Sequence, residues 1–351
     1  MNIQKAISSL LNPSKLGAHV ACAVAHDAPC EGDGPRTALL HVRFNEDEPQ
    51  IDALAEFLWG QCMYYALPRK RRLEYTAAIE KDFTLIARVH QAVRDVFITF
   101  NATSPSRASE LGEVLAYCVV QHHLSAAQVA AKMALKTSAN MPVHGLDGIH
   151  ATFEGDALTI FFLESKLAGS ANAGLKDYAK SAAGFLANRK QYLREYELVS
   201  DLGHLDSLEG AAREAALDFF DIVGKPDLPR RERSVGVICY SERRFNAKLP
   251  VSDGPVDAHE EHFAGLYRTD HKRHRSAANK HIKASGADTA KTLLFLVAVP
   301  DVNVLRKAFY RAMGVEPPHE DIPAASEDEE ENAPGSAEDL DVVAPVESTD
   351  A

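Results

Sequence analysis

Residues 147–166 contain two apolar runs, rich in β-branched and aromatic side chains, on either side of Gly155–Asp156. A glycine followed by an aspartate is typical of the two-residue turn of a β-hairpin. Counting outwards from this turn places Asp147 opposite Glu164, and the alternation of side chains along a strand puts Lys166 on the same face as Glu164. The run 158–163 is apolar on both of its faces, which predicts a central strand covered on both sides.

Two carboxylates and one ammonium group therefore meet at the open end of the predicted hairpin. Carboxylates held this close repel each other unless a cation or a proton lies between them. Mg²⁺, or Mn²⁺, suits ligands that are all oxygen and keeps positions for phosphate and water. A lysine beside it can orient the attacking water or offset charge in the transition state. The alternative is a plain salt bridge between Glu164 and Lys166 at a solvent-exposed strand end.

A helix is predicted over residues 110–123, and it is apolar nearly all round, as is typical of a helix buried between layers. Glu110 and Glu113 lie in its first turn. A buried carboxylate needs a partner, and a metal ion is one such partner. The alternative for either acid is an exposed position favoured by the helix dipole alone. Helical geometry does not choose between the two glutamates.

The net charge of −12 is concentrated at the end of the chain. Residues 316–351 carry 13 carboxylates and no Lys or Arg, and the remaining 38 basic and 37 acidic residues nearly balance. The acidic segment has the composition of a disordered tail. A nucleic-acid partner therefore stays compatible with the rest of the chain.

The five cysteines are scattered and form no CxxC pair, which argues against a disulfide framework or a zinc cluster. The N-terminal apolar run is too short for a signal peptide, and no stretch of 18 apolar residues could span a membrane. We therefore expect a cytoplasmic protein.

The length and composition of the chain predict two domains followed by a tail. An N-terminal α/β module is expected over residues 1–100, a second domain with the hairpin over 101–315, and the tail over 316–351. The other predicted strands are Thr37–Phe44, Val235–Tyr240 and Thr292–Val299; the other predicted helices are Ile51–Leu67, 74–99, Ala126–Lys136, 175–199 and Asp206–Val223.

Three basic segments are candidates for phosphate contact. Residues 268–283 carry six Lys or Arg and three histidines against Asp270, a composition that fits contact with a nucleic-acid backbone or with an acidic partner. Lys176 and Lys180 lie one turn apart on a predicted helix. Arg69–Arg72 follows another helix. For each segment the alternative is an ordinary solvated surface.

The order Gly112–Glu113 on a helix, Gly145–Gly148, a hairpin and Glu164–Lys166 resembles the HamA family, the nuclease subunit of the Hachiman anti-phage defence system. The resemblance covers roughly residues 105–185. It implies a PD-(D/E)XK nuclease-like mixed sheet flanked by helices, acting on DNA with a divalent metal. It also implies a heterodimer with a helicase subunit, HamB, that restrains the nuclease until DNA damage or phage intermediates release it.

Carried over by position, the resemblance implies metal ligands at Glu113, Asp147 and Glu164, with the carbonyl of Ser165 as a further ligand and Lys166 as the catalytic ammonium. It favours Glu113 over Glu110 because the glutamate follows a glycine. The alternative is a non-catalytic adaptor that binds DNA or the helicase on a decayed nuclease fold. A dinucleotide- or ATP-dependent enzyme is disfavoured because the sequence has neither a GxGxxG motif nor a Walker loop.

Overall fold

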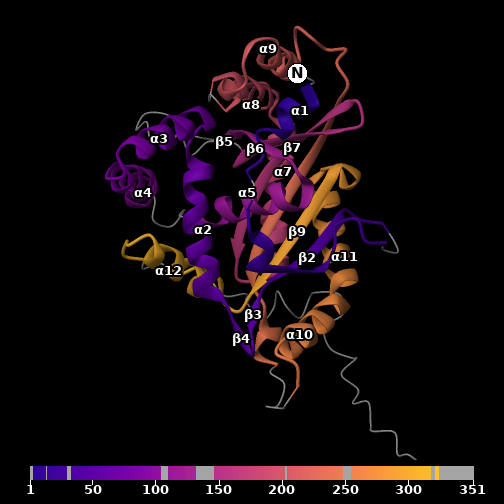
Figure 1. Ribbon diagram of the computed structural model, residues 1–351. Coiled ribbons are helices and arrows are strands. Elements are labelled where there is room, and N and C mark those ends of the chain that lie inside the picture. The colour runs from indigo at the N-terminus through magenta and orange to yellow at the C-terminus, as the bar shows by residue number, and fades with distance from the viewer. Residues whose placement is uncertain are drawn as a thin grey trace, which may run out of the picture.

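The protein is described here by a computed structural model, which covers residues 3–12, 14–29, 33–103, 110–131, 146–201, 204–247, 254–317 and 321–323. Its centre is a seven-stranded mixed sheet (Figure 1). In spatial order the strands are β1 (Val20–Val24), β2 (Arg36–Val42), β9 (Thr292–Val299), β8 (Arg230–Ser241), β7 (Ala157–Ala168), β6 (Gly148–Glu154) and β5 (Ala127–Ala131). The four strands β2, β9, β8 and β7 are parallel, and β1, β6 and β5 pair antiparallel with their neighbours.

Helices cover both faces of this sheet (Figure 1). One face carries α5 (Glu110–Leu124), with α2 (Ile51–Ala66) and α12 (Val302–Ala312) packed beside it. The opposite face carries α7 (Ala171–Ala187), with α11 (His271–Ser285) packed along it. The remaining elements are α1 (Ile3–Ser8), α3 (Arg69–Lys81), α4 (Leu85–Thr103), α8 (Arg189–Asp201), α9 (Gly210–Phe220), α10 (Ala258–Thr269), a small hairpin of β3 (Phe44–Asn45) and β4 (Glu48–Pro49), and short 3-10 turns.

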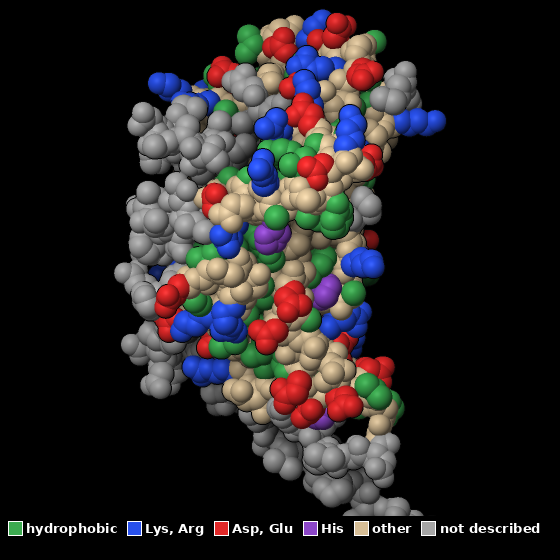
Figure 2. All heavy atoms as spheres, turned by 60° about the vertical axis from the view of Figure 1, so that its left-hand side comes forward, with side chains coloured by type: hydrophobic (Ala, Val, Ile, Leu, Met, Phe, Trp, Pro, Cys, Tyr) green, Lys and Arg blue, Asp and Glu red, His purple; other side chains and the backbone are tan. Residues whose placement is uncertain are grey.

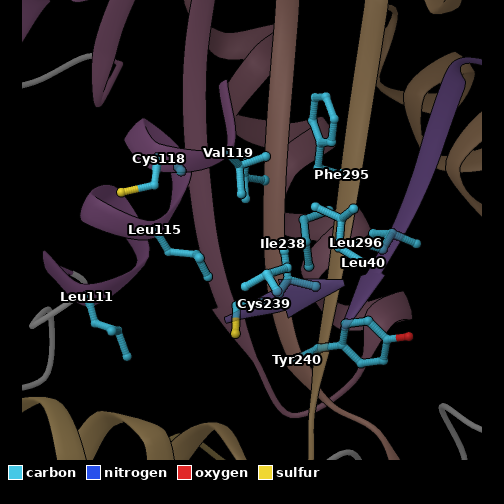
Figure 3. Close-up of a cluster of buried hydrophobic side chains, with 14 of the residues drawn as sticks. Leu40, Leu111, Leu115, Cys118, Val119, Ile238, Cys239, Tyr240, Phe295 and Leu296 are labelled. Carbon is cyan, nitrogen blue, oxygen red and sulfur yellow. The ribbon is translucent and has the colours of Figure 1, made fainter. Parts of the chain in front are cut away.

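The core lies between the sheet and these helices. All eight residues of β9 are buried, as a parallel strand covered on both faces requires. Figure 3 shows Leu115 and Val119 of α5 directed toward the strands that carry Ile238 and Phe295. A second cluster of buried side chains joins β5, β6 and β7 to α1, α8 and α9. The helix that carries the two candidate glutamates is therefore fixed against the middle of the sheet.

The predicted hairpin is confirmed in its turn and in its register. Glu154 pairs with Ala157 and the ladder continues to Gly148 and Leu163. Gly155 has a φ of +62°, a left-handed conformation that glycine adopts without steric cost. The strand β7 lies between β6 and β8, and residues 157–165 of it are buried. The prediction of a central, covered strand is therefore correct, and so is the α/β class with a mixed sheet flanked by helices.

The helix predicted over Ala126–Lys136 is wrong. Residues 127–131 form the edge strand β5, which pairs with β6 and has an irregularity between Gln128 and Ala130. An alanine-rich segment has high helix propensity, but pairing with an open sheet edge outweighs a preference of a few tenths of a kcal/mol per residue. Residues 132–145 lie outside the described part of the chain.

Two long predicted helices are each divided. The stretch 74–99 falls within α3 and α4, which are separated at Asp82, whose carboxylate accepts hydrogen bonds from the backbone N–H and the hydroxyl of Thr84. The stretch 175–199 falls within α7 and α8, with Asn188 between them. The predicted helix Asp206–Val223 is shorter in the structure, where α9 ends at Phe220.

The first hundred residues form the small β3–β4 sheet and also contribute to the common seven-stranded sheet. They supply β1 and β2 to the common sheet, and α4 continues past residue 100 to Thr103. Most of the predicted acidic tail lies outside the described residues. The described residues 321–323 lie against α12, where Ile322 and Asn303 exchange two hydrogen bonds of 2.8 and 3.0 Å. No helix among the described residues is long and apolar enough to cross a membrane.

Candidate metal centre at the start of helix α5

The first turn of α5 lies very close to β7 because residue 112 is a glycine. A Cβ atom at this position would be 3.2 Å from Leu167 Cγ and 3.5 Å from Ser165 Oγ. A larger side chain would push the helix away from the strand. Gly112 therefore brings the acids of the first turn of α5 to the strand that carries Glu164 and Lys166.

Both glutamates of this turn are buried, with exposed fractions of 0 % for Glu110 and 2 % for Glu113. Each accepts a hydrogen bond from a tyrosine of a different helix. Tyr65 of α2 donates to Glu113 Oε2 over 2.5 Å, and Tyr310 of α12 donates to Glu110 Oε2 over 2.8 Å. The alternative of exposed first-turn acids is therefore wrong for both residues. Sequence analysis did not identify either tyrosine.

The pKa of Tyr65 shows which carboxylates lie near its hydroxyl. Burial raises the pKa of Tyr65 well above its usual value, and the charges of Glu113, Asp147 and, more weakly, Glu110 raise it further. Asp147 thus lies near the Tyr65–Glu113 pair, although it comes from the segment just before β6. The charges of two acids from α5 and of the residue before β6 therefore act on one buried hydroxyl.

Asp147 is placed one residue before β6, where the regular ladder stops at Gly148 and Leu163. Its backbone N–H donates to Leu163 O over 3.0 Å. Its carboxylate Oδ2 accepts from the Ser165 backbone N–H over 2.7 Å and from Ser165 Oγ over 2.6 Å. The carboxylate therefore accepts the hydrogen bond from the Ser165 N–H that a backbone carbonyl would accept if the ladder continued. This hydrogen bond fixes the side chain of Asp147 at Ser165.

Glu164 and Lys166 lie on the same face of β7, as the alternation predicted. Lys166 Nζ donates to Glu164 Oε1 over 2.6 Å. The alternative of a solvated salt bridge at a strand end does not describe this pair, because the side chains are only 24 % and 11 % exposed. The ammonium is held part-buried beside the candidate carboxylates.

Asp177 of α7 is an additional acid beside Lys166, and sequence analysis did not find it. Burial lowers the pKa of Lys166, but Glu164, Asp147 and Asp177 together outweigh burial, so this pKa lies above its ordinary value. Lys180, one turn further along α7, lies 3.9 Å from Asp177. The ammonium of Lys166 is therefore fully charged at neutral pH and faces acids from three elements.

Comparison with protein families gives one result. The family model HamA matches residues 21–313. The chain belongs to the HamA family. This family is linked to anti-phage defence, and its match covers the candidate site and all of the sheet but Val20. Neither the curated proteins nor the solved structures contain a match to this chain.

The donors of the site fit a hard divalent cation chemically. Glu113, Asp147 and Glu164 offer carboxylate oxygens and Ser165 offers a carbonyl, which is the ligand type that Mg²⁺ and Mn²⁺ prefer. Glu113 and Asp147 both raise the pKa of Tyr65, and carboxylates that act on the same hydroxyl repel each other unless a cation or a proton lies between them. The roles of these four residues as ligands and of Lys166 in catalysis remain predictions.

Another group of potential ligands lies at the end of β8 in this HamA-family protein. Among the described residues, Glu242, Asp270 and His274 have ligand atoms within 4.8 Å of one another, which Glu113, Asp147 and Glu164 do not. Arg244 already donates to both oxygens of Asp270, over 2.6 and 2.9 Å, and Arg273 lies 3.2 Å away. These guanidinium groups supply the positive charge that a metal would bring, so we interpret the group as a buried ion network.

The basic segment 268–283 is less available to nucleic acid than its composition predicted. The side chain of Arg275 donates to the carbonyls of Gly34 and Pro35, Arg268 donates to a backbone carbonyl of β1, and His274 is buried. Exposed lysines remain on α11 at 272, 280 and 283. Figure 2 shows basic and acidic side chains interspersed over the face that it presents.

The two shorter basic segments have different surroundings. Lys176 and Lys180 are exposed on α7, and Lys180 is close to the acid that faces Lys166. In the cluster Arg69–Arg72, Arg72 points inward and donates to Asn12 Oδ1 over 2.7 Å and to Leu67 O over 3.2 Å. The described contacts therefore favour α7 over the Arg69–Arg72 cluster as the phosphate-facing element near the site.

Proposed function

We propose that this protein is a metal-dependent DNA nuclease that acts in anti-phage defence. One observation supports the proposal most strongly: three elements meet at Ser165 of β7. Gly112 packs the first turn of α5, with Glu113, against Ser165, the carboxylate of Asp147 binds Ser165, and Glu164 and Lys166 flank it in the strand. These residues come from three separate elements. Core packing alone does not require acids and a lysine at this place, because burying charged groups is costly unless they are compensated.

In the proposed site, Glu113, Asp147, Glu164 and the carbonyl of Ser165 would hold Mg²⁺ or Mn²⁺. The bound ion would polarise the scissile phosphate and lower the pKa of a water molecule. Tyr65 fixes the orientation of Glu113, and the Ser165 N–H and hydroxyl fix Asp147. Lys166, held charged by its acidic neighbours, would orient the attacking water or neutralise charge on the phosphate as the bond breaks.

A helicase partner is part of the proposal. The family link to anti-phage defence supports it, and so does the absence of a Walker loop from the sequence, since strand separation driven by ATP would need a second subunit. A nuclease that acts without restraint would also damage the DNA of its own cell. We expect the helicase subunit to bind this chain as a heterodimer and to control its access to DNA.

The decisive experiment is incubation of the purified protein with plasmid DNA in Mg²⁺ or Mn²⁺, with EDTA as the metal-free condition. Lys166→Ala is compared with Lys190→Ala, which removes an exposed lysine from α8, away from the site. We expect metal-dependent cleavage that Lys166→Ala slows by about two to four powers of ten, or ~3–5 kcal/mol of barrier, while Lys190→Ala cuts at the wild-type rate. Cleavage by Lys166→Ala at the wild-type rate would refute the assignment.

The alternative is a non-catalytic adaptor, and one observation favours it: Asp147 and Lys166 already have partners within the chain, Ser165 and Glu164. Calorimetric titration with Mn²⁺ separates the two functions. A nuclease should bind the ion and lose affinity in Asp147→Asn but not in Asp156→Asn, a matched change in the exposed hairpin turn. An adaptor has no need of the ion, so absence of binding together with absence of cleavage would favour it.

A further inference from the structure

A polar cavity lies at the opposite end of α5 from the candidate metal centre. Its volume is about 420 Å³, and it is lined by residues of the β1–β2 region, the end of α5 and the first residues of β8 and β9. Helix α5 ends at Leu124, so the sheet face beyond it is not covered by this helix. Since α5 has 15 residues, the two sites are about 20 Å apart.

Three arginines line the cavity: Arg36, Arg231 and Arg233. They lie on one face of the sheet, because Arg36 pairs with Leu293, Leu293 pairs with Val235, and positions 231 and 233 share the face of Val235. The parallel register therefore gathers guanidinium groups from β2 and β8 that are far apart in sequence.

Little negative charge balances these arginines. Of the described residues that line the cavity, Glu154 is the acid, and one of its oxygens lies 3.4 Å from Arg231 Nη1. Three positive charges thus face one negative charge. Like charges that line one cavity repel one another, and a bound anion would relieve this repulsion.

Two histidines, His26 and His123, also line the cavity. Burial lowers the pKa of His123 to about 4, and His122 and His26 add to the lowering. Burial also lowers the pKa of His26; Asp27 opposes this change and Arg36 adds to it. Both rings are therefore neutral at pH 7, and each can donate one N–H to an anion or stack on a flat ligand.

We propose that this cavity binds the phosphate groups of a nucleotide or of a nucleic-acid strand end. A guanidinium group can donate two parallel hydrogen bonds to two oxygens of a phosphate. Three arginine side chains therefore suit a ligand with two or more negative charges. A volume of this size suits a ligand as large as a nucleotide rather than a single small ion. Phe161 and Leu293, the strand partners of Arg233 and Arg36, add apolar surface to the lining. The site is separate from the proposed nuclease centre and does not depend on it.

Binding is tested by calorimetry on the full chain in EDTA, so that no metal bridges a ligand to the other site. The probes are pyrophosphate, deoxynucleoside mono- and triphosphates, and a short single-stranded oligonucleotide with or without a 5′-phosphate. Arg36→Gln and Arg231→Gln each remove a guanidinium from an exposed position at the start of its strand. Arg189→Gln is the matched control, because Arg189 is exposed on α8 and lies over the ring of Tyr192, outside the cavity.

We expect binding of at least one phosphate probe, weakened about tenfold or more by each cavity substitution and unchanged by Arg189→Gln. The melting temperature of each variant shows whether it is folded. Preference for the free nucleotides identifies a small-molecule site, and preference for the 5′-phosphorylated oligonucleotide identifies a strand-end site. Binding of none of the probes, or equal binding by a folded Arg36→Gln/Arg231→Gln double variant, would overturn the proposal, whereas loss of plasmid cleavage in Lys166→Ala bears only on the nuclease centre.

Discussion

Removal of the Tyr65 hydroxyl is the most direct test of how the buried acids of α5 are held. Tyr65 is 1 % exposed, and its hydroxyl donates to Glu113 Oε2 over 2.5 Å. Phenylalanine keeps the ring and removes only the donor, so the carboxylate loses a hydrogen bond at a place that water does not reach. A hydrogen bond to a charged group contributes about 1.5–3 kcal/mol. We therefore expect Tyr65→Phe to lower the free energy of unfolding by about 2 kcal/mol.

The measurement is urea unfolding at neutral pH in EDTA, followed by far-ultraviolet circular dichroism. Tyr64→Phe is the matched control, because this neighbouring tyrosine of α2 is 40 % exposed and its hydroxyl loss should cost less than about 0.5 kcal/mol. In a double-mutant cycle with Glu113→Gln, the coupling should account for most of the loss. If Tyr65→Phe is no more destabilising than Tyr64→Phe, the charge environment inferred for Glu113 is wrong.

Two further predictions concern packing and pH. Gly236→Ala should destabilise the protein by about 1–3 kcal/mol, because the new Cβ would lie 2.8 Å from the ring of Tyr178. Gly184→Ala, on α7 with nothing within 4 Å, should stabilise it by up to about 1 kcal/mol; thermal melts that shift in the same direction would contradict this. Burial, with Arg72 and His150, lowers the pKa of His204 to about 3. The unfolded chain therefore binds a proton near pH 6.5 that the folded chain excludes, and stability should be complete above pH 6.5 and fall toward pH 3. His204→Asn should flatten this fall by up to about 1.4 kcal/mol per pH unit, and parallel urea midpoints for wild type and variant between pH 7 and 4.5 would show that His204 is not responsible.

The hairpin could be predicted from sequence because its determinants are local. Gly155 fixes the turn, and the alternation of side chains then fixes which residues face each other from Glu154 and Ala157 outwards. The same counting placed Asp147 opposite Glu164, whereas in the structure the carboxylate of Asp147 binds Ser165. The open end of the hairpin differs from a regular ladder, because the carboxylate of Asp147, and not a backbone carbonyl, accepts the Ser165 N–H. Alternation places side chains on faces, but it does not reveal such a replacement.

The partners of the site could not be predicted, because they come from distant parts of the chain. Tyr65 is 48 residues from Glu113, and Tyr310 is 200 residues from Glu110. Neither tyrosine stands in a local pattern that separates it from an ordinary core residue. The basic segment 268–283 fails for the same reason: its composition is unusual, but the carbonyls that bind Arg275 lie 240 residues away and more. Charge composition shows that cations are present and leaves their partners undetermined.

The two glutamates of α5 are distinguished only by these distant contacts. Helical geometry gave no reason to prefer one, and the family resemblance preferred Glu113 because a glycine precedes it. The structure supplies an independent physical reason. Glu113 shares Tyr65 with Asp147, whose charge acts on that hydroxyl more strongly than the charge of Glu110 does. Glu110 instead binds Tyr310 and so fastens α12 to the start of α5. Glu113 thus lies near Asp147, another proposed metal ligand, while Glu110 anchors α5 to α12. The first turn of α5 therefore provides one ligand of the proposed site and also helps to hold the helix in place.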